Sequence, residues 1–575
     1  MKLKLITALF ALMLLLSLSA CNIPAESEPG TVVSSEMSET TEPKTEEPTS
    51  PEENPDSDVP TEGLLYSVVD GYAEVSLGDA PRDLEKIVIA DTYEGLPVTH
   101  IATSAFEAMR KLKTVVIPDS VSAIGDYAFE SCISLTEVTL PNRMKNIGSG
   151  AFRKCIALKK VTLPDALTRI FGETFADCSA LEQLVIPDAV ISINARAFER
   201  CQKLIQSEIG VSYVDKWVIY ADRTLTEAIL REDTVGIAMY AFEDCKDLQR
   251  VELPDTLKTL GYGAFSGCKN LNAISLPDNI KNWESLVFSG CTNLSSVILP
   301  NHLEEIPMSS FTGCANLETI VIPNNVKKIN NSAFSHCSAL RAINIPDGLK
   351  SIGQWAFENC NLLMQTEDDV SYVGKWVIDC DISAVNVDLR DDTVGIAVAA
   401  FEKCSALRSI DMPKSLRIVG YGAFKGCDEE LFHIENGVSY VGRWAISIDR
   451  SITEVTLRPG TIGLADMAFG GGRNLQHVAL SDGIVTIGSR VFDFCDVLEY
   501  VVLPISVIEI EDEAFYSCDM LTAVYYLGTA EDWAFVSTNF ERNGLAEATV
   551  YFYSEELPTV SGNYWHYVDG VPTAW

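Results

Sequence analysis

Apolar and polar positions along most of this chain follow one pattern that returns every 23 residues. Its clearest marker is a phenylalanine, found at Phe106, Phe129, Phe152, Phe175, Phe198, Phe242, Phe265, Phe288, Phe311, Phe334, Phe357, Phe401, Phe424, Phe469, Phe492 and Phe515. Twelve of the fifteen intervals are 23 residues, and the other three are 44, 44 and 45. A fixed period in the twenties predicts a solenoid, because each repeat must bury its hydrophobic face against a neighbour. Such a stack also argues against an enzyme, since it offers a long surface rather than one converging pocket.

Within one repeat, the residue types predict a short helical turn, a strand and two turns. In the repeat that begins at Phe129, Cys132 lies three residues further on, the spacing that places two side chains on one helix face. Val138 and Leu140 alternate with a polar residue, so both point to the same side of a short strand. Pro141 then ends the strand, because proline has no N–H to donate to a ladder.

The repeated string Leu-x-x-Val-x-Leu-Pro, followed by Ile-Gly-x-x-Ala-Phe-x-x-Cys, resembles the BspA-type leucine-rich repeat of bacterial surface proteins. The resemblance covers about residues 64–527. It implies an α/β repeat solenoid, a right-handed superhelix with one parallel β-sheet and with short helices or turns on the other side. It also implies a role in attachment or protein recognition.

The chain divides by composition into five expected parts. These are a lipoprotein signal peptide at 1–20, an acidic, disordered Ser/Thr/Pro/Glu-rich stalk at 21–62, an N-terminal cap at 63–103, about sixteen repeats at 104–527 and an aromatic C-terminal cap at 528–575. Stretches without the full repeat suit caps that cover the open ends of the core. The aromatic tail has a second interpretation, since its rings also suit stacking on sugars.

The first residues predict export and attachment to a membrane. Lys2 and Lys4 precede an apolar run at 5–18 that is too short to span a bilayer comfortably, as in a secretory signal. Leu18-Ser19-Ala20-Cys21 resembles a bacterial lipobox, which implies cleavage before Cys21 and acylation of that cysteine. Several acyl chains, each contributing roughly 0.8 kcal/mol per buried CH₂, give stable anchoring. The alternative is a plain cleaved signal peptide with an incidental cysteine.

Net charge narrows the possible partners. The chain carries a formal charge of −38, and a polyanion repels nucleic acid and anionic lipid.

Taken together, the repeats and the N-terminal signal lead us to expect a monomer on the outer face of a bacterial cell membrane, held there by lipid, with an extracellular protein or glycan as its partner. A spacer or cell-envelope scaffold without a discrete ligand is the alternative, and an enzyme whose site no motif reveals is a distant third.

Fourteen of the sixteen cysteines lie three residues after a repeat phenylalanine. An exported chain rich in cysteine invites a disulfide ladder, yet free cysteine is also among the most buried residue types. Met109 and Gly472 occupy the same position in two repeats, which favours buried free thiols. No Cys-x-x-Cys pair, shared histidine spacing, nucleophile elbow or phosphate loop occurs, so we expect no metal, cofactor or catalytic residue.

The three long intervals contain insertions near 202–224, 361–383 and 428–451. Each has two apolar runs around a Gly/Asp-Lys/Arg turn, which predicts a β-hairpin. The candidate ligand-binding residues are Tyr213, Trp217, Tyr372, Trp376, Tyr440 and Trp444, because tyrosine and tryptophan are enriched at interface hot spots. Alternatively, each hairpin packs these rings on the solenoid as an elaborated rung.

The outward face of the sheet is a second candidate surface. One strand position, which alternates with the apolar ones, is occupied by Val116, Thr139, Thr162, Val185, Ile229, Glu252, Ser275, Ile298, Val321, Asn344, Asp388, Asp411, Thr456, Ala479, Val502 and Tyr525. Outward aliphatic side chains on a regular face suggest a contact surface for a protein, although β-branched residues also simply favour a strand.

Overall fold

A computed structural model describes residues 59–511, 513–538, 544, 545 and 547–575 of the chain. The signal peptide, Cys21 and all but the last residues of the stalk lie outside these described residues. In the described part, the chain is a β-solenoid built from very short strands. None of its helices is long and apolar enough to cross a membrane.

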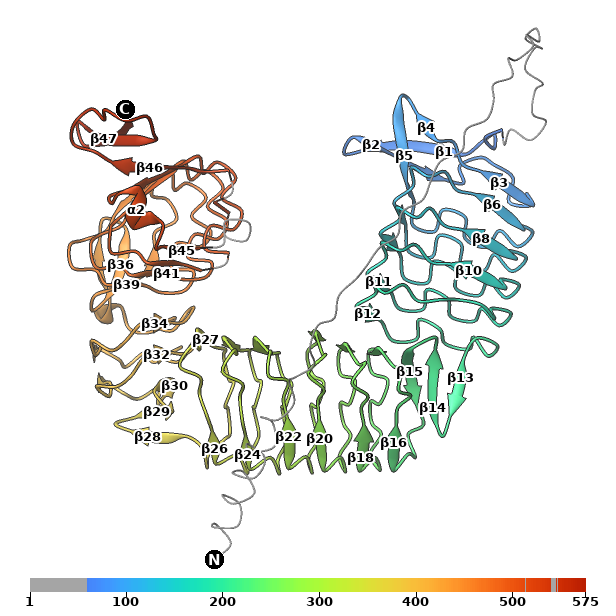
Figure 1. Ribbon diagram of the computed structural model, residues 1–575, viewed down its shortest axis with the longest axis horizontal. Helices are drawn as coiled ribbons and strands as arrows, with labels where there is room; N and C mark the ends of the chain where they lie inside the picture. Colours follow the sequence, from blue (N-terminus) through green and yellow to red (C-terminus); the bar gives the residue numbers. More distant parts are fainter. Residues whose placement is uncertain (1–58, 512, 539–543, 546) are drawn as a thin grey trace, which may run out of the picture. The chain divides into compact units, whose positions relative to one another are not determined.

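The rungs contribute strands to two parallel ladders on different sides of the coil (Figure 1). The first ladder contains β3 (Lys86–Val88), β6 (Thr114–Val116), β8 (Glu137–Thr139), β10 (Lys160–Thr162), β16 (Glu227–Ile229), β18 (Arg250–Glu252), β20 (Ala273–Ser275), β22 (Ser296–Ile298), β24 (Thr319–Ile320), β26 (Ala342–Ile343), β31 (Asn386–Asp388), β33 (Ser409–Asp411), β38 (Glu454–Thr456), β40 (His477–Ala479), β42 (Tyr500–Leu503) and β44 (Ala523–Tyr526). The second ladder contains β7 (Ala123–Ile124), β9 (Asn146–Ile147), β11 (Arg169–Ile170), β12 (Ser192–Ile193), β17 (Gly236–Ile237), β19 (Thr259–Leu260), β21 (Asn282–Trp283), β23 (Glu305–Ile306), β25 (Lys328–Ile329), β27 (Ser351–Ile352), β32 (Gly395–Ile396), β34 (Ile418–Val419), β39 (Gly463–Leu464), β41 (Thr486–Ile487), β43 (Glu509–Ile510) and β45 (Ser537–Thr538). The predicted repeat solenoid is confirmed, with two parallel ladders where one sheet was predicted.

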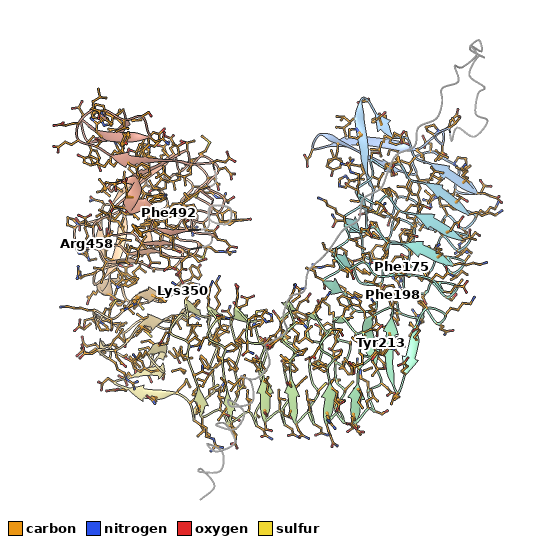
Figure 2. The ribbon with its side chains drawn as sticks, in the orientation of Figure 1. Phe175, Phe198, Tyr213, Lys350, Arg458 and Phe492 are labelled. Atoms are coloured by element: carbon orange, nitrogen blue, oxygen red, sulfur yellow. The ribbon has the colours of Figure 1, made fainter. Side chains whose placement is uncertain are left out.

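Stacked phenylalanines fill the core between the ladders. The rings of Phe129 and Phe152 lie 5.4 Å apart at an interplanar angle of 2°, and those of Phe175 and Phe198 lie 5.7 Å apart (Figure 2). Leucine, isoleucine and valine of both ladders surround this column and are buried. One side chain per rung therefore repeats the same contact, which explains the strict 23-residue period.

The segment around each phenylalanine forms turns, and the predicted helical turn is wrong. The residues two before and two after Phe129 are Tyr127 and Ser131, with φ of 57° and 61°. Left-handed residues also stand two positions before and two positions after the other repeat phenylalanines. Lys154, for example, follows Phe152 in this way, and Gly290 follows Phe288. A left-handed residue cannot continue a right-handed helix. Among the described residues, helix is confined to η1 (Glu429–Leu431) and α2 (Ala530–Trp533), both outside these turns.

Antiparallel strands are added at both ends of the solenoid. At the start, β1 (Leu65–Val69) pairs with β2 (Tyr72–Ser76), which continues in parallel to β5 (Leu96–Ile101), and β4 (Thr92–Tyr93) pairs with β5. At the other end, β46 (Thr549–Tyr553) and β47 (Tyr564–Val568) extend the first ladder in parallel, and β48 (Val571–Ala574) closes it as an antiparallel edge.

Each insertion forms three antiparallel strands, one more than the predicted hairpin. The strands are β13 (Gln206–Glu208), β14 (Val211–Val214) and β15 (Trp217–Ala221) in the first insert; β28 (Gln365–Glu367), β29 (Val370–Val373) and β30 (Trp376–Cys380) in the second; and β35 (His433–Glu435), β36 (Val438–Val441) and β37 (Trp444–Ile448) in the third. The last strand of each insert pairs in parallel with the next strand of the second ladder. Each insert is therefore a rung in which a β-strand replaces the phenylalanine turn.

The hydrophobic core divides at the first insert. One cluster of buried side chains runs from Ala73 to Ala238, another runs from Val211 to Leu545, and the two overlap in sequence within the first insert and the rung after it. Within the insert, Val214 and Trp217 belong to the first cluster, whereas Tyr213 belongs to the second. The second and third inserts lie within one continuous cluster.

Candidate binding surfaces

The six aromatic side chains predicted to bind a ligand lie in the core. Tyr213, Trp217, Tyr372, Trp376, Tyr440 and Trp444 are each only 1–3% exposed. The prediction that these side chains are exposed anchors for a ligand is therefore corrected, because so little of each ring is in contact with solvent. The structure favours the alternative interpretation, in which the hairpins are elaborated rungs.

Each buried tyrosine is held by an arginine that follows it eighteen residues later. The phenol oxygen of Tyr213 accepts a hydrogen bond from the backbone N–H of Arg231 at 3.3 Å, and the Arg231 guanidinium lies 4.1 Å from the centre of the ring. The same pair of contacts recurs at Tyr372 with Arg390 and at Tyr440 with Arg458. Burial raises the pKa of Tyr213 above its usual value, so the phenol stays neutral.

Each buried tryptophan lies flat against a glycine of the next rung. A Cβ atom built on Gly236 would lie 2.4 Å from the ring of Trp217. On Gly395 it would lie 2.5 Å from Trp376, and on Gly463 it would lie 2.4 Å from Trp444. No side chain fits at those distances, so the tryptophan and the glycine form a matched pair that fixes where each insert joins the second ladder.

An exposed group of tyrosines covers the outward side of the last strands of the first ladder. We call this group the tyrosine face; it consists of Tyr500, Tyr525, Tyr551, Tyr553 and Tyr567, from strands β42, β44, β46 and β47. Strand pairing places Tyr525 beside Tyr551, with ring centres 5.4 Å apart, and Tyr500 lies 5.3 Å from Tyr525. Tyr553 and Tyr567 are 37% and 44% exposed.

A buried tryptophan, Trp565, lies among the rings of the tyrosine face, because it pairs with Tyr553 across β46 and β47 on the same side of the sheet. Trp565 is fully buried, and its indole N–H donates a hydrogen bond to the carbonyl of Tyr526 at 2.9 Å. The rings of Tyr525, Tyr553 and Tyr567 contact it with centres 4.9–5.3 Å away. The tyrosines are thus pre-ordered by packing, which lowers the entropy lost when a partner binds.

The tyrosine face is amphipathic, with neutral phenol groups and with carboxylates at its edge. Burial raises the pKa of Tyr500 and of Tyr525, so both phenols remain protonated near neutral pH. His477 stacks on Tyr500 with ring centres 4.2 Å apart, and it lies 3.2 Å from Glu454 and 3.3 Å from Glu499. Such a surface offers apolar ring area together with hydroxyl and carboxylate groups for hydrogen bonds.

Four of the aliphatic side chains predicted on the outward side of the first ladder are exposed, whereas Val116 is only partly exposed and Val502 is buried beside Tyr525. Val185, Ile229, Ile298 and Val321 are 61–75% exposed. Three polar or charged residues, Glu252, Ser275 and Asn344, stand at equivalent places on other rungs. The aliphatic residues are thus spread along the ladder, whereas the tyrosine face is one connected group.

The repeat cysteines are buried free thiols, as predicted, with Cys427 partly exposed. In twelve of the fourteen, the thiol donates to the carbonyl of the phenylalanine one rung earlier, as Cys132 does to Phe106 at 3.2 Å. Burial raises the pKa of Cys132 to about 12, which keeps it protonated and unreactive. In the described part of the chain, no three His, Cys, Asp or Glu side chains are placed to hold a metal ion.

A family model described as BspA type leucine rich repeat region matches residues 99–225, 217–341, 327–453 and 448–550. No curated protein matches the chain.

Among solved structures, a leucine-rich repeat protein from Bacteroides ovatus is 22% identical over 86% of this chain and 100% of its own, with a TM-score of 0.27. A leucine rich cell surface protein from Faecalibacterium prausnitzii is 21% identical over 83% of this chain and 97% of its own, with a TM-score of 0.21. The pneumococcal vaccine antigen PcpA is 15% identical over 86% of this chain and 93% of its own, with a TM-score of 0.23. Superpositions of this quality carry no argument about function.

Proposed function

The chain belongs to the BspA-type leucine-rich repeat family, and from this membership we propose that it is a bacterial surface protein that binds an extracellular protein or glycan. The observation that supports this proposal best is the tyrosine face. Tyrosine supplies large contact area at low entropic cost and dominates many recognition surfaces. Tyr553 and Tyr567 are exposed beside three partly buried tyrosines, so the group offers a partner connected ring area together with hydroxyl groups.

A binding assay on purified full-length protein tests this function. The protein is presented to immobilised matrix proteins, mucins and neutral glycans, and the double variant Tyr553→Ala with Tyr567→Ala is compared with it. Each exposed hot-spot tyrosine contributes on the order of 2 kcal/mol, so we expect at least a thirtyfold loss of affinity for the captured partner. Tyr421→Ala with Tyr516→Ala is the matched control, since these tyrosines are about half exposed elsewhere.

Three results would count against this assignment. Equal loss in the control would mean a general effect of removing tyrosine. Loss on Ile229→Ser with Ile298→Ser, with the tyrosine variant unaffected, would move the site to the aliphatic positions of the first ladder. Failure of the native protein to bind any member of the panel would favour the spacer or scaffold.

We also propose that lipid on Cys21 holds the protein at the outer face of the cell membrane. The lipobox-like sequence Leu18-Ser19-Ala20-Cys21 supports this. Cys21→Ala should then release the protein into the medium or leave an uncleaved precursor, detected by fractionation and by the mass of the N-terminal peptide. Normal processing and membrane retention of the variant would contradict lipid anchoring.

A further inference from the structure

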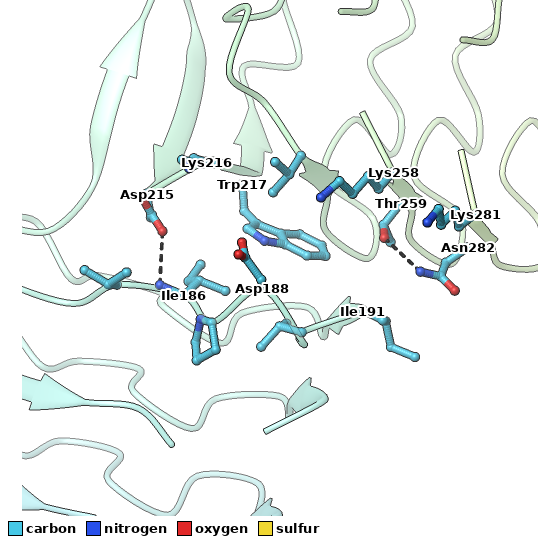
Figure 3. A pocket seen from close by; sticks show the side chains of 14 residues that line it. Ile186, Asp188, Ile191, Asp215, Lys216, Trp217, Lys258, Thr259, Lys281 and Asn282 are labelled. Carbon is cyan, nitrogen blue, oxygen red and sulfur yellow. Dashed lines mark hydrogen bonds between the residues drawn. The ribbon is translucent and has the colours of Figure 1, made fainter. Parts of the chain in front are cut away.

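A cavity of about 480 Å³ lies where the first insert meets the neighbouring rungs (Figure 3). Here the second ladder is interrupted, because β12 pairs with β11, whereas β17 pairs with β15 of the insert. One wall comes from the segment 185–191 and the other from the insert and the following rungs. The cavity thus lies where the insert joins the stack, and its buried apolar lining, Ile186, Val190 and Trp217, belongs to the first core cluster.

Three lysines line this cavity. Lys258 and Lys281 occupy the same position on successive rungs, so their backbones are about 4.8 Å apart, and Lys216 comes from the turn of the insert. All three are exposed, and none forms an ion pair within the part of the chain that the structure describes.

Two carboxylates share the cavity but do not neutralise these lysines. Asp215 accepts a hydrogen bond from the backbone N–H of Ile186 at 3.1 Å, so part of its acceptor capacity is used. Asp188 lies beside the indole of Trp217 (Figure 3). These carboxylates repel a ligand with many negative charges, yet a ligand with one anionic group can reach the lysines and leave Asp188 to accept hydrogen bonds from hydroxyl groups.

The remaining lining is apolar on one side and polar on the other. Val185 and Ile191 are 73% and 44% exposed and form an aliphatic wall. Across the cavity, the Asn282 amide donates to the Thr259 hydroxyl at 3.4 Å, and both offer further donors and acceptors. The volume lies within the range of about 300–1,000 Å³ that is usual for small-molecule sites.

We propose that this cavity binds a sugar residue that carries a single oxyanion, either a carboxylate or a sulfate ester. The ammonium groups of Lys258 and Lys281 hold the anion, the C–H face of the sugar ring packs against Val185 and Ile191, and the sugar hydroxyls hydrogen-bond to Asp188 and Asn282. The site is separate from the tyrosine face, which lies on the last strands of the first ladder. The two proposals therefore fail independently.

Calorimetric titration of the purified full-length protein with matched sugars tests the proposal. The probes are 3′-sialyllactose, 3′-sulfolactose and lactose, which share one disaccharide and differ in the anionic group. We expect both anionic sugars to bind at least tenfold more tightly than lactose. Lys258→Ala with Lys281→Ala should weaken their binding about tenfold, whereas the exposed pair Lys269→Ala with Lys414→Ala, which changes the net charge equally, should leave it unchanged.

The arms of this experiment separate the alternatives. Binding of one anionic sugar alone would identify the carboxylate or the sulfate as the natural group and would support the proposal. Equal binding of lactose, loss in the control variant, or the absence of binding would overturn it. Hexaglutamate is the last probe: lysine-dependent binding of this peptide, as tight as that of the sugars, would mean a surface for acidic protein and would also overturn the sugar assignment. Melting curves check that both double variants fold.

Discussion

Most repeat thiols are buried hydrogen-bond donors that connect one rung to the rung before. Because these thiols are enclosed and donate to a carbonyl, and because burial raises the pKa of thiols such as Cys132, the reactive thiolate is scarce in the folded protein. Such a thiol becomes reactive only when its rung opens.

We predict that the native protein at pH 8 resists alkylation. Labelling of the fourteen repeat cysteines should be at least a hundredfold slower than in denaturant, and denaturant without reductant should expose nearly all of them as free thiols. Mass spectrometry after alkylation measures both. Prompt labelling of several repeat cysteines in the native state, or a mass that shows disulfides, would contradict this account.

The contact between Trp376 and Gly395 predicts the effect of one added methyl group. Gly395→Ala places a Cβ about 2.5 Å from the indole, so the strand and ring must separate, at a cost of about 1–3 kcal/mol of folding stability. Gly348→Ala is the control, because no atom lies within 4 Å of its added Cβ. Denaturant unfolding compares the two, and equal stability would show that the insert is not seated through this glycine.

At the level of elements, the repeat was predictable because each rung repeats the same buried environment. The phenylalanine, cysteine and strand positions follow from the 23-residue period, and the insert hairpins follow from their apolar runs. The conformation of the turns around Phe129 was not predictable from the sequence. Tyr127 and Ser131 are residue types that do not favour a left-handed conformation, and hydrogen bonds to the next rung impose it on them. The period alone cannot reveal the second ladder, whose strands are two residues long.

The tyrosine face escaped sequence analysis for a different reason. Tyr500, Tyr525 and Tyr551 are 25 and 26 residues apart, so they depart from the period. Strand pairing aligns Tyr525 with Tyr551, whereas Tyr500 pairs with Ala523 and its ring contacts that of Tyr525 diagonally. The composition of the C-terminal segment showed that it is rich in aromatic residues. Only the register of β46 and β47 shows which of these side chains lie on the same face of the sheet. Likewise, Lys258 and Lys281 are visibly one period apart, whereas the approach of Lys216 depends on how the insert joins the ladder.

Long-range contacts between rungs on either side of the second and third inserts involve a cluster of charged groups. Lys350 pairs with Glu509 at 2.9 Å and with Glu511 at 3.3 Å, across 159 residues of sequence in the first case (Figure 2). Nearby, burial and the negative charge of Glu511 together raise the pKa of Asp466 to about 7, against the opposing effect of Lys328. The backbone N–H of Asp466 donates to Val419 at 2.9 Å.

Asp466 should make stability depend on pH. Its folded pKa lies above the unfolded value of about 3.9, so the folded protein holds this proton more tightly. The contribution is complete below about pH 4 and is lost as the pH rises to about 7. Asp466→Asn should remove this loss and stabilise the protein at pH 8 by about 1–2 kcal/mol, whereas the exposed Asp519→Asn should not. Thermal melts from pH 4 to pH 8 measure it; identical profiles for native protein and Asp466→Asn would refute the assignment.

For the whole molecule, the divided core predicts unfolding in two steps. Rungs stabilise only their neighbours, so the boundary between the two core clusters, which passes through the first insert and the rung after it, is a weak interface in an otherwise continuous stack. Hydrogen exchange in rising denaturant should show peptides before residue 204 and peptides after residue 211 losing protection at different concentrations. Peptides on the two sides of the second insert, which lies in a single cluster, are the internal control and should open together. A single transition for all peptides would contradict the division.

The direction of the hydrogen bonds between rungs has a mechanical consequence. Bonds between rungs, such as those from Phe129 to Ala151 and from Phe152 to Thr174, run from one coil to the next. Tension applied at one end therefore meets the outermost rung alone, and that rung peels away before the next is loaded. Each released coil of 23 residues adds about 75 Å of extended chain. Under a sudden force, a protein built in this way lengthens in small, reversible steps as single rungs unfold in turn, rather than failing at one strong point.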